Sequence, residues 1–321
     1  MKKPEPSEET GRERSDLWFQ ALLDNAVKTI DPWFNEAGFH FNYARHRSTM
    51  LDAGPRIGET FLLNTRLQRY DRETPASVSH YFNDTSMTML SLNGLESPDA
   101  LAIIDLPPSI ELSLRLSHCF KRRRSRRVYT ADPMPLAALA TLLRAAAGIT
   151  GHGKASLHQS ELGGVTLQFR SAPSPGGLYG VELYAVVQHV KGLEPGLYLY
   201  HPRSDKLLLR KTQKSDGVVD KVRAACAYPE ELITHSRAGA VFLLAGRPFK
   251  LMRKYGDRGL RYLFVETGEM TQNIHLACTA LGFGSVESAG FYDDELNDAI
   301  GLDGGTATVL HTVLAGLPAE A

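Results

Sequence analysis

Apolar residues recur with a helical period in the C-terminal half of the chain. The clearest stretch runs from about Gly259 to Leu281, where apolar positions are spaced by seven, four, three and four residues. That spacing places them on one stripe of a helix, formed by Leu263, Met270, Ile274, Ala277 and Leu281. Because Phe264 and Val265 lie off this stripe, the sequence predicts a long helix that is buried nearly all round.

Shorter patterns predict the other elements of this region. We expect helices over residues 110–120, 136–147, 216–228 and 293–300, and strands over 181–190, 196–200, 207–211, 238–245 and 306–315. The run 238–245 is continuously apolar, which is typical of a strand buried on both faces. Helices and strands follow one another without a regular βαβ alternation, so the pattern favours an α+β domain over a doubly wound parallel sheet.

The N-terminal third lacks such clear patterns. Residues 1–15 are polar and rich in Glu, which is typical of a mobile tail. Ser15 and Asp16 open an apolar-periodic stretch that predicts a helix, whereas the following part up to residue 109 has only short apolar runs. The sequence therefore predicts a disordered tail over residues 1–15, a helical and irregular subdomain over 16–105 and a main domain over 106–321.

The overall charge excludes some classes of partner. Lys and Arg together number 36, as do Asp and Glu, so the formal net charge is zero. A balanced chain is not built as a whole to coat nucleic acid or an anionic membrane. No apolar segment follows the N-terminal lysines, and no run approaches the roughly 18 apolar residues that span a bilayer. We therefore expect a soluble, cytoplasmic protein.

The cysteines and histidines do not predict a metal site. Cys119, Cys226 and Cys278 are far apart and form no CxxC pair, which disfavours both a disulfide framework and a thiolate zinc site. The chain also lacks the HExxH, EF-hand and Walker A motifs. We expect His275, inside the long helix, to be packed or hydrogen-bonded rather than catalytic.

A basic segment precedes the main apolar patterns. Residues 121–127 contain six cations in seven positions, and such charges repel one another unless an anion or carboxylates offset them. A phosphate monoester does so well, because arginine binds its oxygens in bidentate fashion. A solvated basic face or a nucleic-acid contact are the alternatives for this segment.

A loop rich in proline and glycine follows at residues 170–179. Prolines fix φ, and adjacent glycines remove side chains, so the backbone can approach a flat ligand closely. A turn with a purely structural role before the next strand is the alternative.

The pair Lys254 and Tyr255 is flanked by glycines, which indicates a loop where both side chains could turn inward. Either residue could serve as a base near neutral pH only if its pKa fell by roughly three units. A neighbouring cation can lower the pKa of a tyrosine, and burial can lower that of a lysine. The alternative is an exposed polar loop.

A GxG motif at residues 282–284 does not predict dinucleotide binding. The dinucleotide fingerprint follows a strand and opens a helix, whereas this motif ends a helix and precedes a strand. Gly282 is better explained as a left-handed residue that caps the helix.

Taken in order, these segments resemble one family. The chain is similar to SagB-type dehydrogenases, a branch of the nitroreductase-like FMN-dependent flavoproteins that includes azoline oxidases of thiazole- and oxazole-modified peptides. The resemblance covers roughly residues 105–316. The matching segments are RRSRRVY at 123–129, APSPGGL at 172–178, KYGDRGLRY at 254–262, Glu266-Thr267-Gly268 with Gln272-Asn273, and the later ALGFG, DDELN and GLDG. Glu269 replaces a histidine of the family pattern, and Gly180 replaces a proline.

The resemblance implies an α+β nitroreductase-like fold: a mixed or antiparallel sheet flanked by helices, a long central helix, and FMN at a homodimer interface. It implies that Lys254 and Tyr255 are catalytic. The FMN phosphate and ribityl chain would be held by Arg123, Arg124, Ser125 and Arg127. The isoalloxazine ring would be lined on one side by Pro173, Ser174, Gly176 and Gly177, and on the other by Leu281, Gly282, Phe283 and Gly284.

The implied reaction is oxidation of thiazoline or oxazoline rings to azoles in a ribosomally made peptide, with dioxygen reoxidising the flavin. A precursor peptide and a cyclodehydratase complex are the implied partners. Two alternatives stay open: an NAD(P)H-dependent nitroreductase or other flavin reductase, and a non-catalytic scaffold subunit of a peptide-modification complex.

Overall fold

The computed structural model describes residues 57–67, 69, 76–79, 99–156 and 164–319. The chain divides into two compact units, residues 1–66 and 67–321, and α3 (Ile57–Asn64) lies in the first. The tail predicted over residues 1–15 and the helix predicted after Ser15 lie outside the described residues. The division at residues 15 and 105 therefore stays a prediction.

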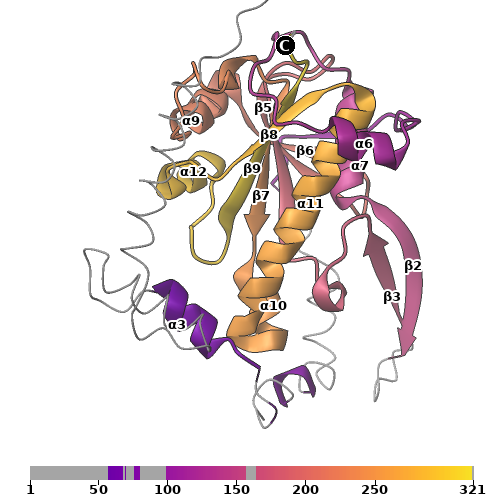
Figure 1. Cartoon of the computed structure of the whole chain (residues 1–321), viewed down its shortest axis with the longest axis vertical. Helices are drawn as coiled ribbons and strands as arrows, with labels where there is room; N and C mark the ends of the chain where they lie inside the picture. The colour runs from indigo at the N-terminus through magenta and orange to yellow at the C-terminus, as the bar shows by residue number, and fades with distance from the viewer. Residues whose placement is uncertain (1–56, 68, 70–75, 80–98, 157–163, 320–321) are drawn as a thin grey trace, which may run out of the picture. The chain divides into compact units, whose positions relative to one another are not determined.

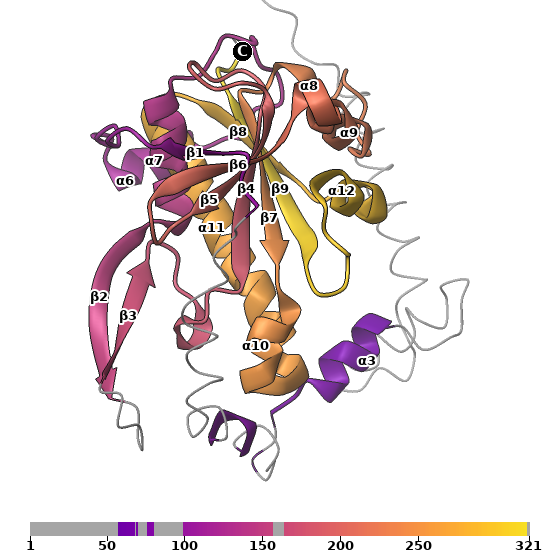
Figure 2. The same cartoon turned by 180° about the vertical axis from the view of Figure 1, so that it is seen from behind.

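An antiparallel sheet forms the centre of the second unit (Figures 1 and 2). It has seven strands in the order β1-β6-β5-β4-β7-β9-β8. A separate antiparallel hairpin, β2 paired with β3, projects to one side of this sheet in both views. The strands are β1 (Ala102–Asp105), β2 (Ile149–Ser156), β3 (Gly164–Arg170), β4 (Val181–Val187), β5 (Gly196–His201), β6 (Lys206–Thr212), β7 (Ala240–Gly246), β8 (Gly284–Ser288) and β9 (Thr308–Gly316).

Helices cover both faces of the sheet. Alternate residues of a strand point to opposite faces, and in β4 Leu183 packs with α7 and α11 while Val186 packs with α9 and α12. Both faces of the central strands are therefore buried, as the continuous apolar run in β7 predicts. The labelled α-helices from residue 99 onward are α6 (Leu116–Arg122), α7 (Leu136–Ala147), α8 (Gln213–Asp216), α9 (Val218–Ala224), α10 (Pro248–Tyr255), α11 (Gly259–Leu281) and α12 (Asp293–Ile300).

Most predicted elements are confirmed. The helices expected over 136–147, 259–281 and 293–300 coincide with α7, α11 and α12, and the five expected strands begin within two residues of β4, β5, β6, β7 and β9. The expectation that α11 is buried nearly all round is wrong. Phe264 is 52% exposed and Val265 54% exposed, so one side of the helix presents an apolar surface.

Two predicted helices are too long because tertiary hydrogen bonds hold the backbone elsewhere. The helix expected from residue 110 begins at Leu116, since Ile110 N donates to Thr141 Oγ1 of α7 (2.8 Å). The helix expected to reach residue 228 ends at Ala224. Beyond it, Ala227 N donates to Gly290 O (2.9 Å).

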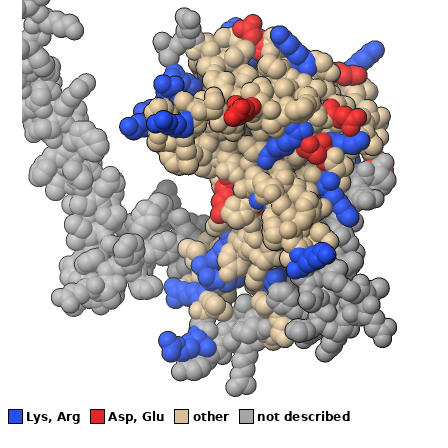
Figure 3. Space-filling view, turned by 90° about the vertical axis from the view of Figure 1, so that its right-hand side faces the viewer, with Lys and Arg blue, Asp and Glu red and all other residues tan. Residues whose placement is uncertain are grey.

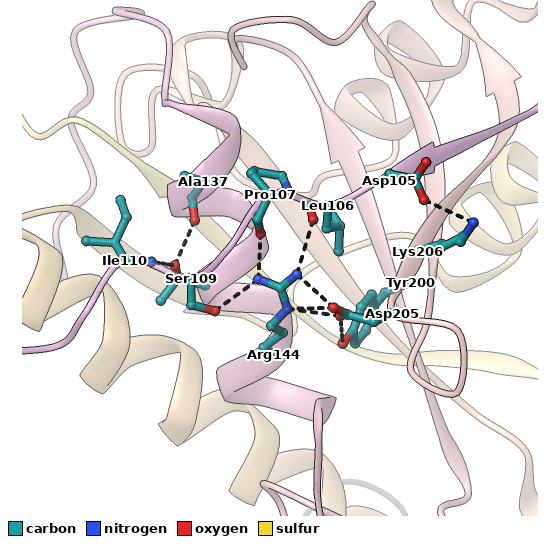
Figure 4. A network of polar contacts seen from close by, with 11 residues as sticks. Asp105, Leu106, Pro107, Ser109, Ile110, Ala137, Arg144, Tyr200, Asp205 and Lys206 are labelled. Atoms are coloured by element: carbon teal, nitrogen blue, oxygen red, sulfur yellow. Dashed lines mark hydrogen bonds and ion pairs between the residues drawn. The ribbon is translucent and has the colours of Figure 1, made fainter.

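A hydrogen-bond network around Arg144 joins α7 to the segment before α6 and to the β5–β6 turn (Figure 4). Its Nε donates to both carboxylate oxygens of Asp205 (3.0 Å each). Its Nη1 donates to Pro107 O (2.7 Å) and Ser109 Oγ (3.0 Å). Tyr200 Oη also donates to Asp205 (2.8 Å), so Arg144 and Asp205 together hold the 106–109 segment against α7 and the β5–β6 turn. Within the described residues, no helix is long and apolar enough to cross a membrane.

Candidate active site

The proline- and glycine-rich loop is anchored by a buried carboxylate of α11. Glu266 is 1% exposed, and its Oε2 accepts a hydrogen bond from Ser174 Oγ (2.6 Å). The backbone N–H groups of Gly180 and Val181 donate to the same carboxylate (3.3 and 3.0 Å). Burial raises the pKa of Glu266, while these donors oppose that rise. The loop is thus held from both of its ends by one side chain.

Left-handed backbone conformations shape the loop. Gly176 (φ 66°) and Gly177 (φ 65°) both adopt a region that favours glycine. A Cβ on Gly176 would lie 2.6 Å from Tyr255 Oη and 2.7 Å from Lys254 Nζ, whereas a Cβ on Gly177 would meet nothing within 4 Å. The missing side chain of Gly176 is therefore what lets the Lys254–Tyr255 pair approach the loop.

The Lys254–Tyr255 pair lies at the end of a helix, so the prediction of a loop at this place is wrong. Both residues belong to the last turn of α10. Tyr255 leaves helical geometry (φ −117°, ψ 8°), and Gly256 follows at φ 57°. Adjacent residues within a regular helix do not share a face. The irregular end of α10 allows these two to turn toward Gly176 together.

The surroundings of the pair favour proton transfer. Lys254 is 4% exposed, and its burial lowers the pKa of the amine. Its Nζ lies 5.4 Å from the centre of the Tyr255 ring. That ring packs edge-on against Tyr262, with centroids 5.0 Å apart. A lysine that loses its proton more readily than usual is thus held beside a tyrosine hydroxyl.

The proline that the family pattern has at position 180 would not fit this chain. A Cβ on Gly180 would lie 2.1 Å from Leu251 Cδ1 and 2.8 Å from Leu263 Cδ1. A proline would also remove the N–H that Gly180 donates to Glu266. Here glycine lets Leu251 of α10 pack directly against the loop. Lys254 lies one turn farther along the same helix, so this packing helps to hold it near Gly176.

The basic segment lies beside the glycine motif that follows α11. Ser125 forms a parallel bridge with Ser285, and Arg126 N donates to Ser285 O (2.9 Å). A Cβ on Gly284 would lie 2.8 Å from Arg126 Cβ, so glycine permits this close approach. Two motifs that are far apart in the sequence, and that the resemblance assigned to one cofactor, are therefore neighbours.

The predicted phosphate-binding residues differ in their exposure and in the hydrogen bonds that they already make. Arg124 Nη1 donates to the carbonyls of Lys121 (3.0 Å) and Arg123 (2.8 Å) at the end of α6. Ser125 and Arg127 are exposed, and Arg123 is half-buried. On the face drawn in Figure 3, basic side chains stand in several separate groups with acidic side chains between them. That distribution does not form one continuous basic surface.

The end of α11 confirms two local predictions. Gly282 caps the helix in the left-handed conformation (φ 79°), and Phe283 N donates to Cys278 O (2.8 Å). His275 is buried, and its Nδ1 shares a 2.7 Å hydrogen bond with Ser285 Oγ. Burial lowers the pKa of His275, and the residue has the packed, hydrogen-bonded role expected of it.

The structure therefore assembles two groups of predicted residues. Gly176, in the loop that also holds Pro173, Ser174 and Gly177, lies against Lys254 and Tyr255, while Ser125 and Arg126 lie against Gly284 and Ser285. The helix α11 connects the groups, because Glu266 anchors the loop and Leu281 leads into the glycine motif. Sequence reasoning gave Glu266 no role. The sequence could have pointed to Glu266, because it is an acidic residue inside a helix predicted to be buried, and a buried carboxylate needs hydrogen-bond partners.

A sequence model of the nitroreductase family matches residues 120–316. The chain belongs to the nitroreductase family. Its members are flavin oxidoreductases, and the family fold predicted from the sequence is confirmed. A relative from Methanocaldococcus jannaschii, which bears the name nitroreductase, is 33% identical over 193 residues; these make up 60% of this chain and 87% of the relative.

Solved structures with this nitroreductase fold include proteins of quite different length. One from Ralstonia eutropha JMP134 is 22% identical with a TM-score of 0.52, covering 72% of this chain and 98% of that chain. One from Anabaena variabilis ATCC 29413 is 24% identical with a TM-score of 0.55; the match covers 74% of this chain and 47%, about half, of that longer chain. A chain of the Escherichia coli microcin synthetase McbBCD complex, solved with truncated pro-MccB17 bound, is 19% identical with a TM-score of 0.51, covering 81% of this chain and 87% of that chain.

Proposed function

We propose that this nitroreductase-family protein is an FMN-dependent dehydrogenase of the SagB type that oxidises thiazoline or oxazoline rings in a ribosomally made peptide. The main observation behind the proposal is the convergence of Lys254 Nζ and Tyr255 Oη on Gly176. A general base and a hydroxyl are thereby held at a glycine loop of the kind that lets a flat ring approach the backbone.

The residues fit FMN in charge and in shape. The 123–127 segment offers exposed cations and a serine hydroxyl to a phosphate that carries about −1.5 to −2 charge. We assign Arg123, Arg124, Ser125 and Arg127 to the phosphate and ribityl chain. Because Arg124 Nη1 already donates to the carbonyls of Lys121 and Arg123, Arg124 would act through its other nitrogens. Pro173, Ser174, Gly176 and Gly177 would line one side of the isoalloxazine. Leu281 to Gly284 follow about 22 Å farther along α11, beside the 123–127 segment, so within one protomer they would contact the phosphate end of FMN and not the other side of the ring.

In this proposal Lys254 is the general base and Tyr255 orients the azoline ring. Aromatisation of the ring removes two hydrogens. One leaves as a proton to the neutral amine of Lys254, whose burial lowers the pKa and raises the neutral fraction near pH 7. FMN held by these residues would supply the hydride acceptor for the second hydrogen and its two bonding electrons. That hydrogen, the two electrons and one further proton would then pass to dioxygen and give hydrogen peroxide.

The partners we propose are a precursor peptide, a cyclodehydratase complex and a second copy of the chain. The similarity to a chain of the McbBCD complex covers 81% of this protein, which supports a peptide and a larger assembly as partners. A homodimer is supported by exposed apolar side chains on neighbouring helices. These are Leu116 and Phe120 of α6, both 58% exposed, and Phe264 and Val265 of α11.

An NAD(P)H-dependent nitroreductase is the second candidate, favoured by the name of the Methanocaldococcus relative. The two functions differ in the electron donor. The purified protein should release FMN on denaturation, and the bound flavin should bleach anaerobically with an azoline peptide. Rapid bleaching by NAD(P)H, with none by azoline peptides, would instead establish the reductase.

The role of the Lys254–Tyr255 pair can be tested separately. Lys254→Ala and Tyr255→Phe should each lower the rate of azoline-dependent flavin reduction while FMN stays bound. Lys214→Ala is the matched control, because Lys214 is exposed on α8. Full turnover in both active-site variants would remove the assignment.

A further inference from the structure

A pocket lies beside the proline- and glycine-rich loop. None of the residues that line it is proposed to bind FMN. It is lined by residues from β3, the loop, β4, the β5–β6 turn and α10. The polar side chains that matter for its chemistry are Gln168, Arg170, Tyr179, Glu182, Arg203 and Lys250. Apolar walls are supplied by Ala147, Leu183 and Leu199.

The cations of this pocket are built into the fold. The Arg170 guanidinium lies over the ring of Tyr179, 4.4 Å from its centre. Lys250 Nζ donates to Tyr179 O (3.1 Å), and Arg170 N donates to Tyr179 Oη (3.0 Å). Tyr179 itself adopts a left-handed φ of 50°, which is strained for a residue with a side chain. One strained tyrosine thus fixes both cations.

Positive charge is in excess among the residues that line the pocket, where Arg170, Arg203 and Lys250 stand against Glu182. The buried carboxylate of Glu266 also acts on Arg170 and Lys250. Glu182, the acidic wall residue of the pocket, is already bound by Arg247 through two hydrogen bonds (2.7 and 2.9 Å). Arg170 Nε is buried and has no hydrogen-bond acceptor among the described residues. Burial, together with the charge of Arg170, lowers the pKa of Lys250 to about 8. An anionic ligand would offset the charge of both cations and accept hydrogen bonds from them.

The pocket is close to the proposed reaction centre. Lys250 and Lys254 are four residues apart on α10, so they share a face of the helix, with their Cβ atoms about 6 Å apart. Another pocket, lined by Gly176 and Gly177, shares Gln168, Arg170 and Tyr179 with this one. A group held at Lys250 would therefore lie one helical turn from the amine at Gly176.

We propose that this pocket binds a carboxylate of the peptide substrate, and thereby selects substrates and places the azoline ring at Lys254. The inference rests on the proposed function for the identity of the substrate, but the pocket can be tested without turnover. A carboxylate is favoured over a phosphate ester because a peptide carries carboxylates at its end and on its acidic side chains without further modification. The carboxylate could come from the end of a peptide or from an acidic side chain.

Direct binding to the FMN-loaded protein is the first test, with N-acetyl-leucine as a chain-end probe and N-acetylglutamic acid α-amide as a side-chain probe. Titration calorimetry should show that at least one binds, and that N-acetyl-leucinamide, which lacks the carboxylate, does not. Lys250→Met should weaken binding about tenfold or more, as expected for loss of a charged hydrogen bond. The probe that binds shows whether the carboxylate comes from the end of a peptide or from an acidic side chain.

Variants separate this site from other cationic surfaces. Lys250→Arg should restore binding, and Lys214→Ala should leave it unchanged. If Lys250→Met does not fold, Arg203→Gln at the exposed rim should still weaken binding several-fold. Equal binding of the amide, or undiminished carboxylate binding in the Lys250 or Arg203 variant, would overturn the proposal.

Turnover distinguishes failure of this inference from failure of the proposed function. Azoline peptides in which the selected carboxylate is replaced by an amide should show a raised KM. If no azoline peptide is oxidised but the carboxylate probes still bind at Lys250, the pocket stands and the proposed function fails. If azolines are oxidised with equal KM whether or not a carboxylate is present, the pocket proposal fails and the function stands.

Discussion

The contact between Gly176 and the Lys254–Tyr255 pair can be tested with two alanine substitutions that differ in one respect. Gly176→Ala and Gly177→Ala both place a Cβ on a backbone at φ of about 65°. Each should therefore cost about 1–2 kcal/mol of folding free energy through the left-handed conformation. Only the Cβ at position 176 collides with the pair.

The size of the collision sets the expected effect on catalysis. The Cβ introduced by Gly176→Ala would stand 2.6 Å from Tyr255 Oη and 2.7 Å from Lys254 Nζ, whereas ordinary contact begins near 3.4 Å. The pair must therefore retreat by about 0.7–0.8 Å. A misplacement of about 1 Å can cost about 10²-fold in rate, so we expect Gly176→Ala to lower flavin reduction by azoline peptide about 10- to 100-fold.

Three measurements separate this effect from backbone strain. Urea unfolding should give similar losses of stability for the two variants. Anaerobic stopped-flow at saturating FMN should show the large rate loss for Gly176→Ala and a much smaller one for Gly177→Ala. Nitrogen-15 NMR of the lysine amines should show a changed titration of Lys254 for Gly176→Ala alone. Equal rate losses, or an unchanged Lys254 signal in Gly176→Ala, would refute the reasoning.

Three further predictions follow from other parts of the structure. Arg144→Met removes the partner of Asp205 and of the 107–109 segment and should lower the free energy of unfolding by about 2 kcal/mol; Lys206→Met, which breaks an exposed pair with Asp105, should change it by less than about 1 kcal/mol. Because the pKa of Lys250 falls from 10.5 to about 8 on folding, the unfolded chain binds more protons in that window, so stability should rise from pH 8 to 10.5 by up to about 3 kcal/mol; a rise of the same size in Lys250→Met would contradict this. Val265→Asp should turn the proposed dimer into a monomer in sedimentation velocity because Val265 is exposed on α11, and a dimer that persists would place the interface elsewhere.

The sequence predicted elements whose burial follows a strict period, and missed elements that lack one. The stripe from Leu263 to Leu281 was enough to find α11 with both bounds. The β2–β3 hairpin was missed because β2 reads ITGHGKAS, which has no alternation of apolar and polar residues. The end of α10 at Lys254 and Tyr255 was predicted as a loop because glycines follow it, and the helix itself was missed although Pro248 at its first turn is a helix-start signal.

The candidate site was predictable as separate motifs but not as an arrangement. The order of motifs predicted the site residues, yet nothing local to Gly176 predicts that Lys254, far along the chain, fills the space of its missing side chain. The same holds for Gly180, whose hydrogen atom in place of a Cβ accommodates Leu251. Long-range packing decides these contacts, and a single sequence shows only one partner of each.

The double attachment of α11 limits how this chain can change in length. A residue inserted between Glu266 and Leu281 would turn everything beyond it by about 100° and advance it by about 1.5 Å. The carboxylate could then hold the loop, or the glycine motif could meet the 123–127 segment, but both could not happen at once. Substitutions along the helix can be absorbed locally, whereas insertions and deletions there would separate the two halves of the site. The projecting β2–β3 hairpin is free of this constraint, so variation in length should accumulate in it.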